Sequence, residues 1–214
     1  MLSLGGIEVY EVKLGEAFLM SSLFHEVEEG LAHLGLGELK GKSWDVVVGG
    51  LGLGYTAAAA LEHREVASLL IVDALHPVIE WHERGLVPLG AKLTTDPRTR
   101  MLNADFFEQA RSADGFDPEQ PGRKFHAVLL DIDHSPRNLL HPGNAAFYQV
   151  DGLKALAAHL HPGGVFALWS DDPPDEEFME LLGSVFATVR AHVVTFPNPL
   201  TETESASTVY VAGQ

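Results

Sequence analysis

The alternation of short apolar runs with longer helical segments is the feature that most constrains how this chain can fold. Five β-prone runs are separated by such segments, and they comprise residues 45–48, 68–72, 100–102, 125–130 and 165–169. This alternation is typical of a parallel sheet with helices on both faces. Two further β-prone runs, 190–196 and 208–211, predict an antiparallel pair. We therefore expect an α/β fold with a doubly wound, mostly parallel sheet of seven strands.

The first residues predict a small appendage to this sheet. Two β-prone runs, 7–13 and 17–20, flank a Leu-Gly-Glu turn and indicate a short N-terminal β-hairpin. Ser21 and Ser22 follow as the expected N-cap of a helix, because apolar residues at helical spacing come directly after them.

Composition excludes several classes of function. The 214 residues, 46% of them hydrophobic, suffice for the core of one α/β domain. The formal charge of −16 disfavours nucleic acid and anionic membrane surfaces as partners and favours a cationic substrate. There is no cysteine, and the histidines lack metal-ligand spacing, so we expect no metal. Without a long apolar run or a signal-like N-terminus, a cytoplasmic location is expected.

A glycine-rich loop, residues 49–54, follows the first strand of the predicted sheet. Gly50, Gly52 and Gly54 permit a tight turn and let a ligand approach the backbone at a helix N-terminus. Asp73 ends the next strand, 19 residues after Gly54, where a carboxylate can accept hydrogen bonds from a ribose. This order predicts a nucleoside site. The loop alone leaves NAD and S-adenosylmethionine open, and glycines after a strand can also serve only the turn.

Polar residues follow three further strands. Asp105, in the segment Asn103-Ala104-Asp105, can accept from an adenine amino group or cap the next helix. Asp131, Asp133 and His134 end the fourth strand and can position and deprotonate an amine, the alternative being a solvated loop. The fifth strand is followed by Asp171 and Asp172, for which the start of the next helix is the favoured interpretation.

Taken together, these motifs resemble the spermidine synthase (aminopropyltransferase) family, which shares the class I methyltransferase fold. The resemblance covers about residues 7–213, and its late part, with Pro-Gly-Gly entering a strand, favours this family over an NAD enzyme. The matching segments are Phe24-His25-Glu26, the 49–54 loop, Ile71-Val72-Asp73, Asn103-Ala104-Asp105, Val128-Leu129-Leu130-Asp131, Phe147-Tyr148 and residues 161–165.

The resemblance implies that an aminopropyl group passes from decarboxylated S-adenosylmethionine to a small amine such as putrescine, leaving methylthioadenosine. It makes Asp73 the ribose ligand, Asp105 the adenine ligand, and Asp131 the acceptor of the amine proton. His25 and Tyr148 match positions near the amine substrate. The resemblance also suggests a homodimer.

Some positions depart from the family pattern. Gly52 stands where the family loop carries an aspartate, Phe24 replaces a tyrosine, and the second carboxylate of an Asp-x-x-Asp-Pro motif is shifted to Asp133 or replaced by His134. Two alternatives therefore stay open: a methyltransferase that uses ordinary S-adenosylmethionine, and a nucleoside-binding homologue without activity.

These expectations divide the chain into two parts. Residues 1–21 form the short hairpin extension, and residues 22–214 form the nucleoside-binding, Rossmann-like catalytic domain.

Overall fold

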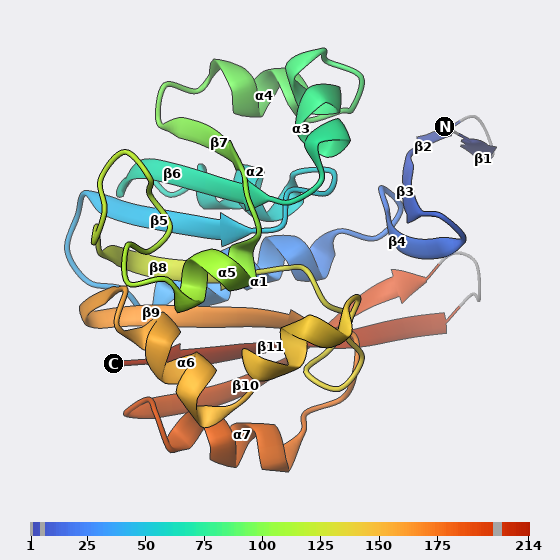
Figure 1. Ribbon diagram of the computed structural model, residues 1–214. Coiled ribbons are helices and arrows are strands. Elements are labelled where there is room, and N and C mark those ends of the chain that lie inside the picture. Colours follow the sequence, from blue (N-terminus) through green and yellow to red (C-terminus); the bar gives the residue numbers. More distant parts are fainter. Residues whose placement is uncertain (1, 5–6, 199–202) are drawn as a thin grey trace.

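The structure is a computed structural model that describes residues 2–4, 7–198 and 203–214. Its centre is a seven-stranded sheet with the order β10-β11-β9-β8-β5-β6-β7, shown in Figure 1. The strands are β5 (Trp44–Gly49), β6 (Val66–Asp73), β7 (Thr99–Asn103), β8 (Phe125–Leu130), β9 (Leu160–Ser170), β10 (Thr188–Asn198) and β11 (Thr203–Gly213). Strands β5 to β9 are parallel, and β11 is antiparallel to both of its neighbours. The predicted sheet is confirmed.

Helices cover both faces of this sheet. They are α1 (Glu26–Gly37), α2 (Tyr55–Ala60), α3 (His76–Glu83), α4 (Gly90–Thr95), α5 (Phe106–Arg111), α6 (Val150–Ala157), α7 (Glu176–Gly183) and the 3-10 helix η1 (Pro142–Ala146). Residues of α1 to α4 pack with Val46 and Val48 of β5, whereas α5 to α7 pack with Val47. The sheet buries both faces because successive side chains of a strand point to opposite sides.

The N-terminal segment forms two small antiparallel pairs. Strand β1 (Leu2–Leu4) pairs with β2 (Ile7–Val9), and β3 (Glu11–Leu14) pairs with β4 (Ala17–Ser21) as the predicted hairpin. The first predicted run is divided at Tyr10. In Figure 1 the hairpin lies beyond the arrowheads of the parallel strands, so it borders the sheet edge where ligands bind in open α/β folds.

The predicted N-cap at Ser21 and Ser22 is wrong. Helix α1 begins at Glu26, and its N-cap position is His25, which makes no capping hydrogen bond through its side chain. The Ser22 hydroxyl instead accepts from the N–H of Tyr10 at 2.9 Å, and Ser21 accepts from that of Leu23 at 3.2 Å. The two hydroxyls thus stabilise the hairpin and the turn after it, and the helix begins three to four residues later than predicted.

Among the described residues, none of the helices combines the length and apolar character needed to cross a membrane.

Candidate active site

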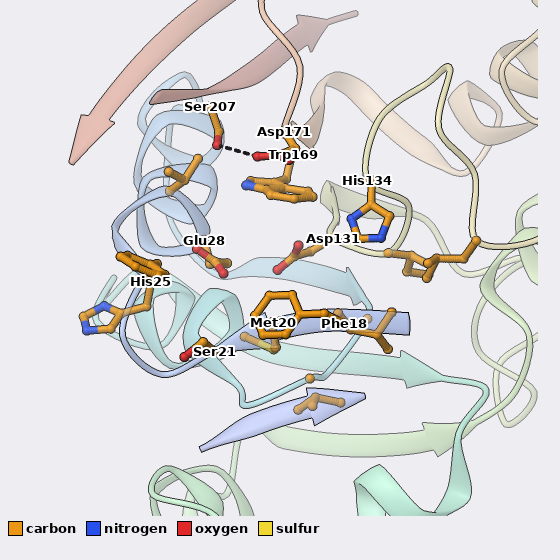
Figure 2. A pocket seen from close by; sticks show the side chains of 18 of the residues that line it. Phe18, Met20, Ser21, His25, Glu28, Asp131, His134, Trp169, Asp171 and Ser207 are labelled. Carbon is orange, nitrogen blue, oxygen red and sulfur yellow. Dashed lines mark hydrogen bonds between the residues drawn. The ribbon is translucent and has the colours of Figure 1, made fainter. Parts of the chain in front are cut away.

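A cavity of about 630 Å³ lies at the carboxyl edge of the parallel strands, bordered by the β3–β4 hairpin and the start of α1 (Figure 2). Six carboxylate side chains line it, namely Glu26, Glu28, Asp73, Asp105, Asp131 and Asp171. Within the described part of the chain, neither lysine nor arginine belongs to the lining. The cavity is therefore electrostatically suited to a positively charged ligand.

Successive strands supply this lining in their order across the sheet. Asp171 follows β9, Asp131 follows β8, Gly50 follows β5, Asp73 ends β6, and Asp105 follows β7. One half of the cavity is thus built on β5, β6 and β7, and the other on β8, β9 and α1. The first half contains the residues predicted to bind a nucleoside, and the second contains Asp131.

The carboxylate of Asp73 is held by two backbone amides. Its Oδ2 accepts from the N–H of Leu51 at 2.8 Å, and its Oδ1 accepts from that of Leu75 at 2.7 Å. Burial raises the pKa of Asp73, and these hydrogen bonds act against that shift. Each oxygen keeps a second lone pair, so the side chain can still accept from a ribose hydroxyl.

Most backbone N–H groups of the glycine loop already donate within the protein. The N–H of Gly50 donates to the Val72 carbonyl, and that of Leu51 donates to Oδ2 of Asp73. The N–H of Leu53 donates to Sδ of Met20, and that of Gly54 donates to the Leu51 carbonyl. A dinucleotide needs such N–H groups free to bind its pyrophosphate. This occupancy and the acidic lining disfavour the NAD interpretation of the loop.

Met20 of the hairpin lies directly against the loop at Gly52. A Cβ atom added to Gly52 would lie 2.4 Å from Sδ of Met20, and the residue has a φ of +47°. A side chain at this position would have to displace Met20. Gly52 stands where the family pattern has aspartate, and in this protein Met20 takes up the space beside it.

Asp105 caps α5, as one of its two predicted roles requires. Its Oδ1 accepts from the N–H groups of Phe107 at 2.8 Å and Glu108 at 3.1 Å. Because the residue also lines the cavity, its Oδ2 can serve a ligand, and the predicted adenine contact stays a prediction. Apolar walls suited to a flat base come from residues that include Leu75, Val78, Phe106 and Ile132.

Three of the predicted nucleoside-binding residues lie outside the cavity lining. The side-chain amide of Asn103 and the backbone N–H of Ala104 both donate to the carbonyl of Asp73, at 2.9 and 3.1 Å. Gly54 has a φ of +92° at the N-cap of α2. These residues shape the backbone around Asp73 and the loop, and the lining itself is provided by Gly50, Gly52 and their neighbours.

Asp131 and Glu28 face each other across the second half of the cavity. Figure 2 shows their carboxylates pointing toward one another, Asp131 from the end of β8 and Glu28 from α1. The Thr56 hydroxyl donates to Oδ2 of Asp131 at 2.8 Å. Burial raises the pKa of Asp131 to about 6. Burial, followed by the negative charge of Asp131, raises the pKa of Glu28 to about 8. The negative charge of Asp131 thus disfavours ionisation of Glu28 as long as no cation lies between them.

His134 and Asp171 border the same half of the cavity. Figure 2 shows Trp169 between Asp171 and the two facing carboxylates, with His134 beside it. The N–H of Asp171 donates to the His134 carbonyl at 2.7 Å, which joins the two loops. The expectation that Asp171 and Asp172 start the next helix is wrong, because Asp175 caps α7 by accepting from two backbone N–H groups.

Two predicted site residues, Asp133 and Tyr148, are not brought to the cavity. Asp133 is fully buried and accepts from the Tyr148 hydroxyl at 2.9 Å, from the Asn144 side chain at 2.9 and 3.1 Å, and from the N–H of Leu140 at 2.7 Å. Burial raises the pKa of Tyr148 well above its usual range, so its hydroxyl stays a donor. The expectation that these side chains face a substrate is corrected: they fix the loop after β8 instead.

His25 lines the cavity at the start of α1, but its ring points away from Asp131 in Figure 2. The ring stacks on Tyr55, with 4.3 Å between centroids, and its Nδ1 lies 2.9 Å from Oε1 of Glu29. Its predicted contact with the substrate stays a prediction.

A cluster with the composition of a metal site lies at the opposite edge of the sheet. Asp45, His126 and His161 have potential ligand atoms within 4.8 Å of one another, at the amino ends of β5, β8 and β9. Nδ1 of His126 accepts from the N–H of Asp45 at 3.0 Å, and Oδ1 of Asp45 pairs with Arg123 at 2.6 Å. These contacts already use one atom each of Asp45 and His126, and the cluster is remote from Asp131.

The sequence prediction missed Glu28, Thr56 and Met20 as parts of the site. A signal for Glu28 was present, because it lies three residues before Leu31 and four before Ala32, on the apolar stripe of α1. An acidic residue within such a stripe indicates a buried carboxylate with a function. Thr56 and Met20 had no comparable signal, since their contacts depend on segments distant in the chain.

Comparisons with known proteins bear on the fold. No protein-family model matches the sequence, and no curated protein matches it. The structure is similar to spermidine synthase from Thermotoga maritima, with a TM-score of 0.68 and 18% identity over 92% of this chain and 61% of that one. It is also similar to a spermidine synthase in complex with the transition state analogue AdoDATO, with a TM-score of 0.71 and 19% identity over 92% and 63% of the two chains.

This chain thus spans about three fifths of the length of the solved structures that it matches. At these identities the likeness concerns the arrangement of strands and helices. In this chain the elements so arranged are the mostly parallel seven-stranded sheet and the helices that flank it. The chain therefore has the methyltransferase-like α/β fold of spermidine synthases, as its motifs predicted.

Proposed function

We propose that this protein transfers an aminopropyl group from decarboxylated S-adenosylmethionine to a small primary amine. The observation that carries the proposal is the composition of the cavity lining. Among the described residues, the lining contains six carboxylates and neither lysine nor arginine. Both substrates are cations, and decarboxylated S-adenosylmethionine has no carboxylate of its own. Ordinary S-adenosylmethionine would bring a carboxylate into this acidic surrounding, where like charges repel. The neighbour with the analogue AdoDATO supports the same class of ligand.

In the proposed reaction, the nitrogen lone pair of the amine attacks the aminopropyl carbon bonded to sulfur. The carbon–nitrogen bond forms as the carbon–sulfur bond breaks, and the bonding pair goes to sulfur, which leaves as the thioether of methylthioadenosine. Asp131 accepts the proton that the amine nitrogen loses, and Thr56 fixes the orientation of that carboxylate. Because the sulfonium is already a good leaving group, the protein's main tasks are orientation and exclusion of water, for which the hairpin is well placed.

The second candidate is a methyltransferase that uses ordinary S-adenosylmethionine. The absence of a side chain at Gly52 favours it, because the loop then supplies no carboxylate to an aminopropyl ammonium group. The two candidates differ in the nucleoside product, which is methylthioadenosine in the first case and S-adenosylhomocysteine in the second.

Mass spectrometry of the nucleoside product tests the proposal directly. The protein is incubated with either decarboxylated or ordinary S-adenosylmethionine, in each case with and without putrescine, cadaverine and spermidine. We expect methylthioadenosine only with the decarboxylated donor and only when an amine is present. Formation of S-adenosylhomocysteine would favour the methyltransferase, and an unchanged nucleoside in every mixture would contradict enzymatic activity on these amines.

The pKa of Asp131 predicts a bend in the pH dependence of turnover. Below about pH 6 the carboxyl is protonated in the free protein and cannot accept the amine proton. We therefore expect a bend near pH 6 in the plot of log(kcat/KM) for the amine against pH. Below it, protonation of Asp131 should cause a loss of about tenfold in kcat/KM for each pH unit. Above about pH 6 the dependence should level off, because the ionised carboxylate and the ammonium ion that it deprotonates are then both the dominant forms. A plot without a bend between pH 5 and 7.5 would remove Asp131 from the proton transfer.

A further inference from the structure

We infer that Glu28 is a ligand of the acceptor amine, so that Glu28 and Asp131 together bind one primary ammonium group between them. The inference rests on the proposed function, since it assumes that the amine nitrogen lies beside Asp131. It adds Glu28 to the substrate-binding residues. Glu28 belongs to α1, which comes before the glycine loop in the chain, whereas the other proposed ligands lie at the ends of strands. It also defines the ligand class as a primary alkylammonium ion.

The two carboxylates are held in place from different elements. The Thr56 hydroxyl oxygen lies 2.8 Å from Oδ2 of Asp131 and 3.2 Å from the backbone carbonyl of Glu28. The N-terminal turn of α2 therefore holds the end of β8 and the first turns of α1 at one point. Thr56 thus contacts the carboxylate of Asp131 and the backbone of Glu28, and the two side chains point toward one another into the cavity (Figure 2).

Glu28 is costly for the stability of the fold. It lies on the apolar stripe of α1, one turn before the buried Leu31, whereas the neighbouring acidic residue Glu29 pairs with His25. In the described part of the chain, the Glu28 carboxylate forms neither a salt bridge nor a hydrogen bond with another side chain, and the hydrogen bond that lowers its pKa comes from its own backbone N–H. A half-buried carboxylate opposite another one is destabilising unless a cation joins them. The raised pKa of Glu28 agrees with the lack of a cationic partner for its carboxylate.

The surroundings select the kind of cation. In Figure 2 the indole of Trp169 lies on one side of the gap between the carboxylates, and Phe18 and Met20 lie on the other. Such walls favour an alkyl chain and an aromatic face next to a cation. A primary ammonium has three N–H donors, enough for both carboxylates, whereas a quaternary ammonium has none.

The test compares Glu28→Gln with the wild-type protein and with a matched control, Glu180→Gln. Glutamine keeps the shape of the side chain and removes its charge, and Glu180 is an exposed residue of α7 outside the cavity lining. We expect KM for putrescine to rise about 10- to 100-fold in Glu28→Gln, the range for a lost hydrogen bond to a charged group. KM for decarboxylated S-adenosylmethionine and all parameters of Glu180→Gln should stay unchanged.

A binding measurement separates this inference from the proposed function. Putrescine and butyltrimethylammonium are titrated by calorimetry into the protein saturated with methylthioadenosine, with melting temperatures measured to establish folding. We expect putrescine to bind the wild-type protein and to bind Glu28→Gln about 10- to 100-fold more weakly. The quaternary ion should bind neither protein. Glu28-dependent binding without turnover would support the inference and contradict the proposed function.

The opposite outcomes are equally distinct. Unchanged putrescine affinity in Glu28→Gln, with normal turnover, would overturn the inference and leave the proposed function intact. A rise in KM for the nucleoside substrate alone would also overturn it, because Glu28 would then serve the aminopropyl chain of the donor. If Glu28→Gln does not fold, Glu28→Asp provides the test, since it retains the charge but shortens the side chain by one methylene. Its affinity for putrescine should fall while that for methylthioadenosine stays unchanged, and an unchanged affinity for both would overturn the inference.

Discussion

Replacement of Asp131 by asparagine is expected to lower kcat about 10²- to 10⁴-fold, the usual contribution of a positioned general base. Asparagine keeps an oxygen that can accept from Thr56, so the loop after β8 should keep its conformation. The amide cannot take up the proton of the amine, however. The affinity for methylthioadenosine should not change, because Asp73 and Asp105 lie in the other half of the cavity.

Single-turnover kinetics and calorimetry with methylthioadenosine measure these two effects separately. The matched control is Asp151→Asn, which makes the same chemical change at an exposed position of α6. Turnover within a few-fold of wild type in Asp131→Asn would eliminate Asp131 as the proton acceptor. If Asp131→Asn lost affinity for methylthioadenosine by a factor similar to its loss of turnover, the substitution would have disturbed the whole cavity edge.

Much of this fold could be predicted because its signals are local. Each parallel strand is a short apolar run, and the helices between them have polar faces, so the pattern itself indicates a covered sheet. The same holds for the positions of Gly50, Asp73 and Asp131. They lie at carboxyl ends of parallel strands, and such ends meet at one edge whatever the side chains around them.

The direction of individual side chains could not be predicted in this way. Asp131 and Asp133 are two residues apart in the same polar segment, yet one enters the cavity and the other is buried. That difference depends on the amide of Asn144 and the hydroxyl of Tyr148, which are the side-chain donors to Asp133. Both donors come from a segment more than ten residues further along the chain, so the pattern around Asp133 contains no trace of them.

The substitution with the largest expected effect on stability is Gly50→Ala. Gly50 has a φ of +94°, and a Cβ atom there would lie 2.0 Å from the carbonyl oxygen of Asp131 and 2.9 Å from its carbonyl carbon. The contact is with backbone, so no side-chain rotation can relieve it. The neighbouring hydrogen bonds from Asp131 to Gly49 and from Gly50 to Val72, at 2.8 and 2.9 Å, prevent the strand ends from separating freely.

We expect Gly50→Ala to lower the free energy of unfolding by about 3–5 kcal/mol, combining backbone strain with overpacking. Gly41→Ala isolates the first contribution, because Gly41 has a similar φ of +86° and an added Cβ would meet nothing within 4 Å. That variant should lose only about 1–2 kcal/mol in the same urea titration. Equal losses would mean that the loop after β5 can move away from Asp131. In that case the close packing of the glycine loop against β8 could not be what holds the carboxylate opposite Glu28.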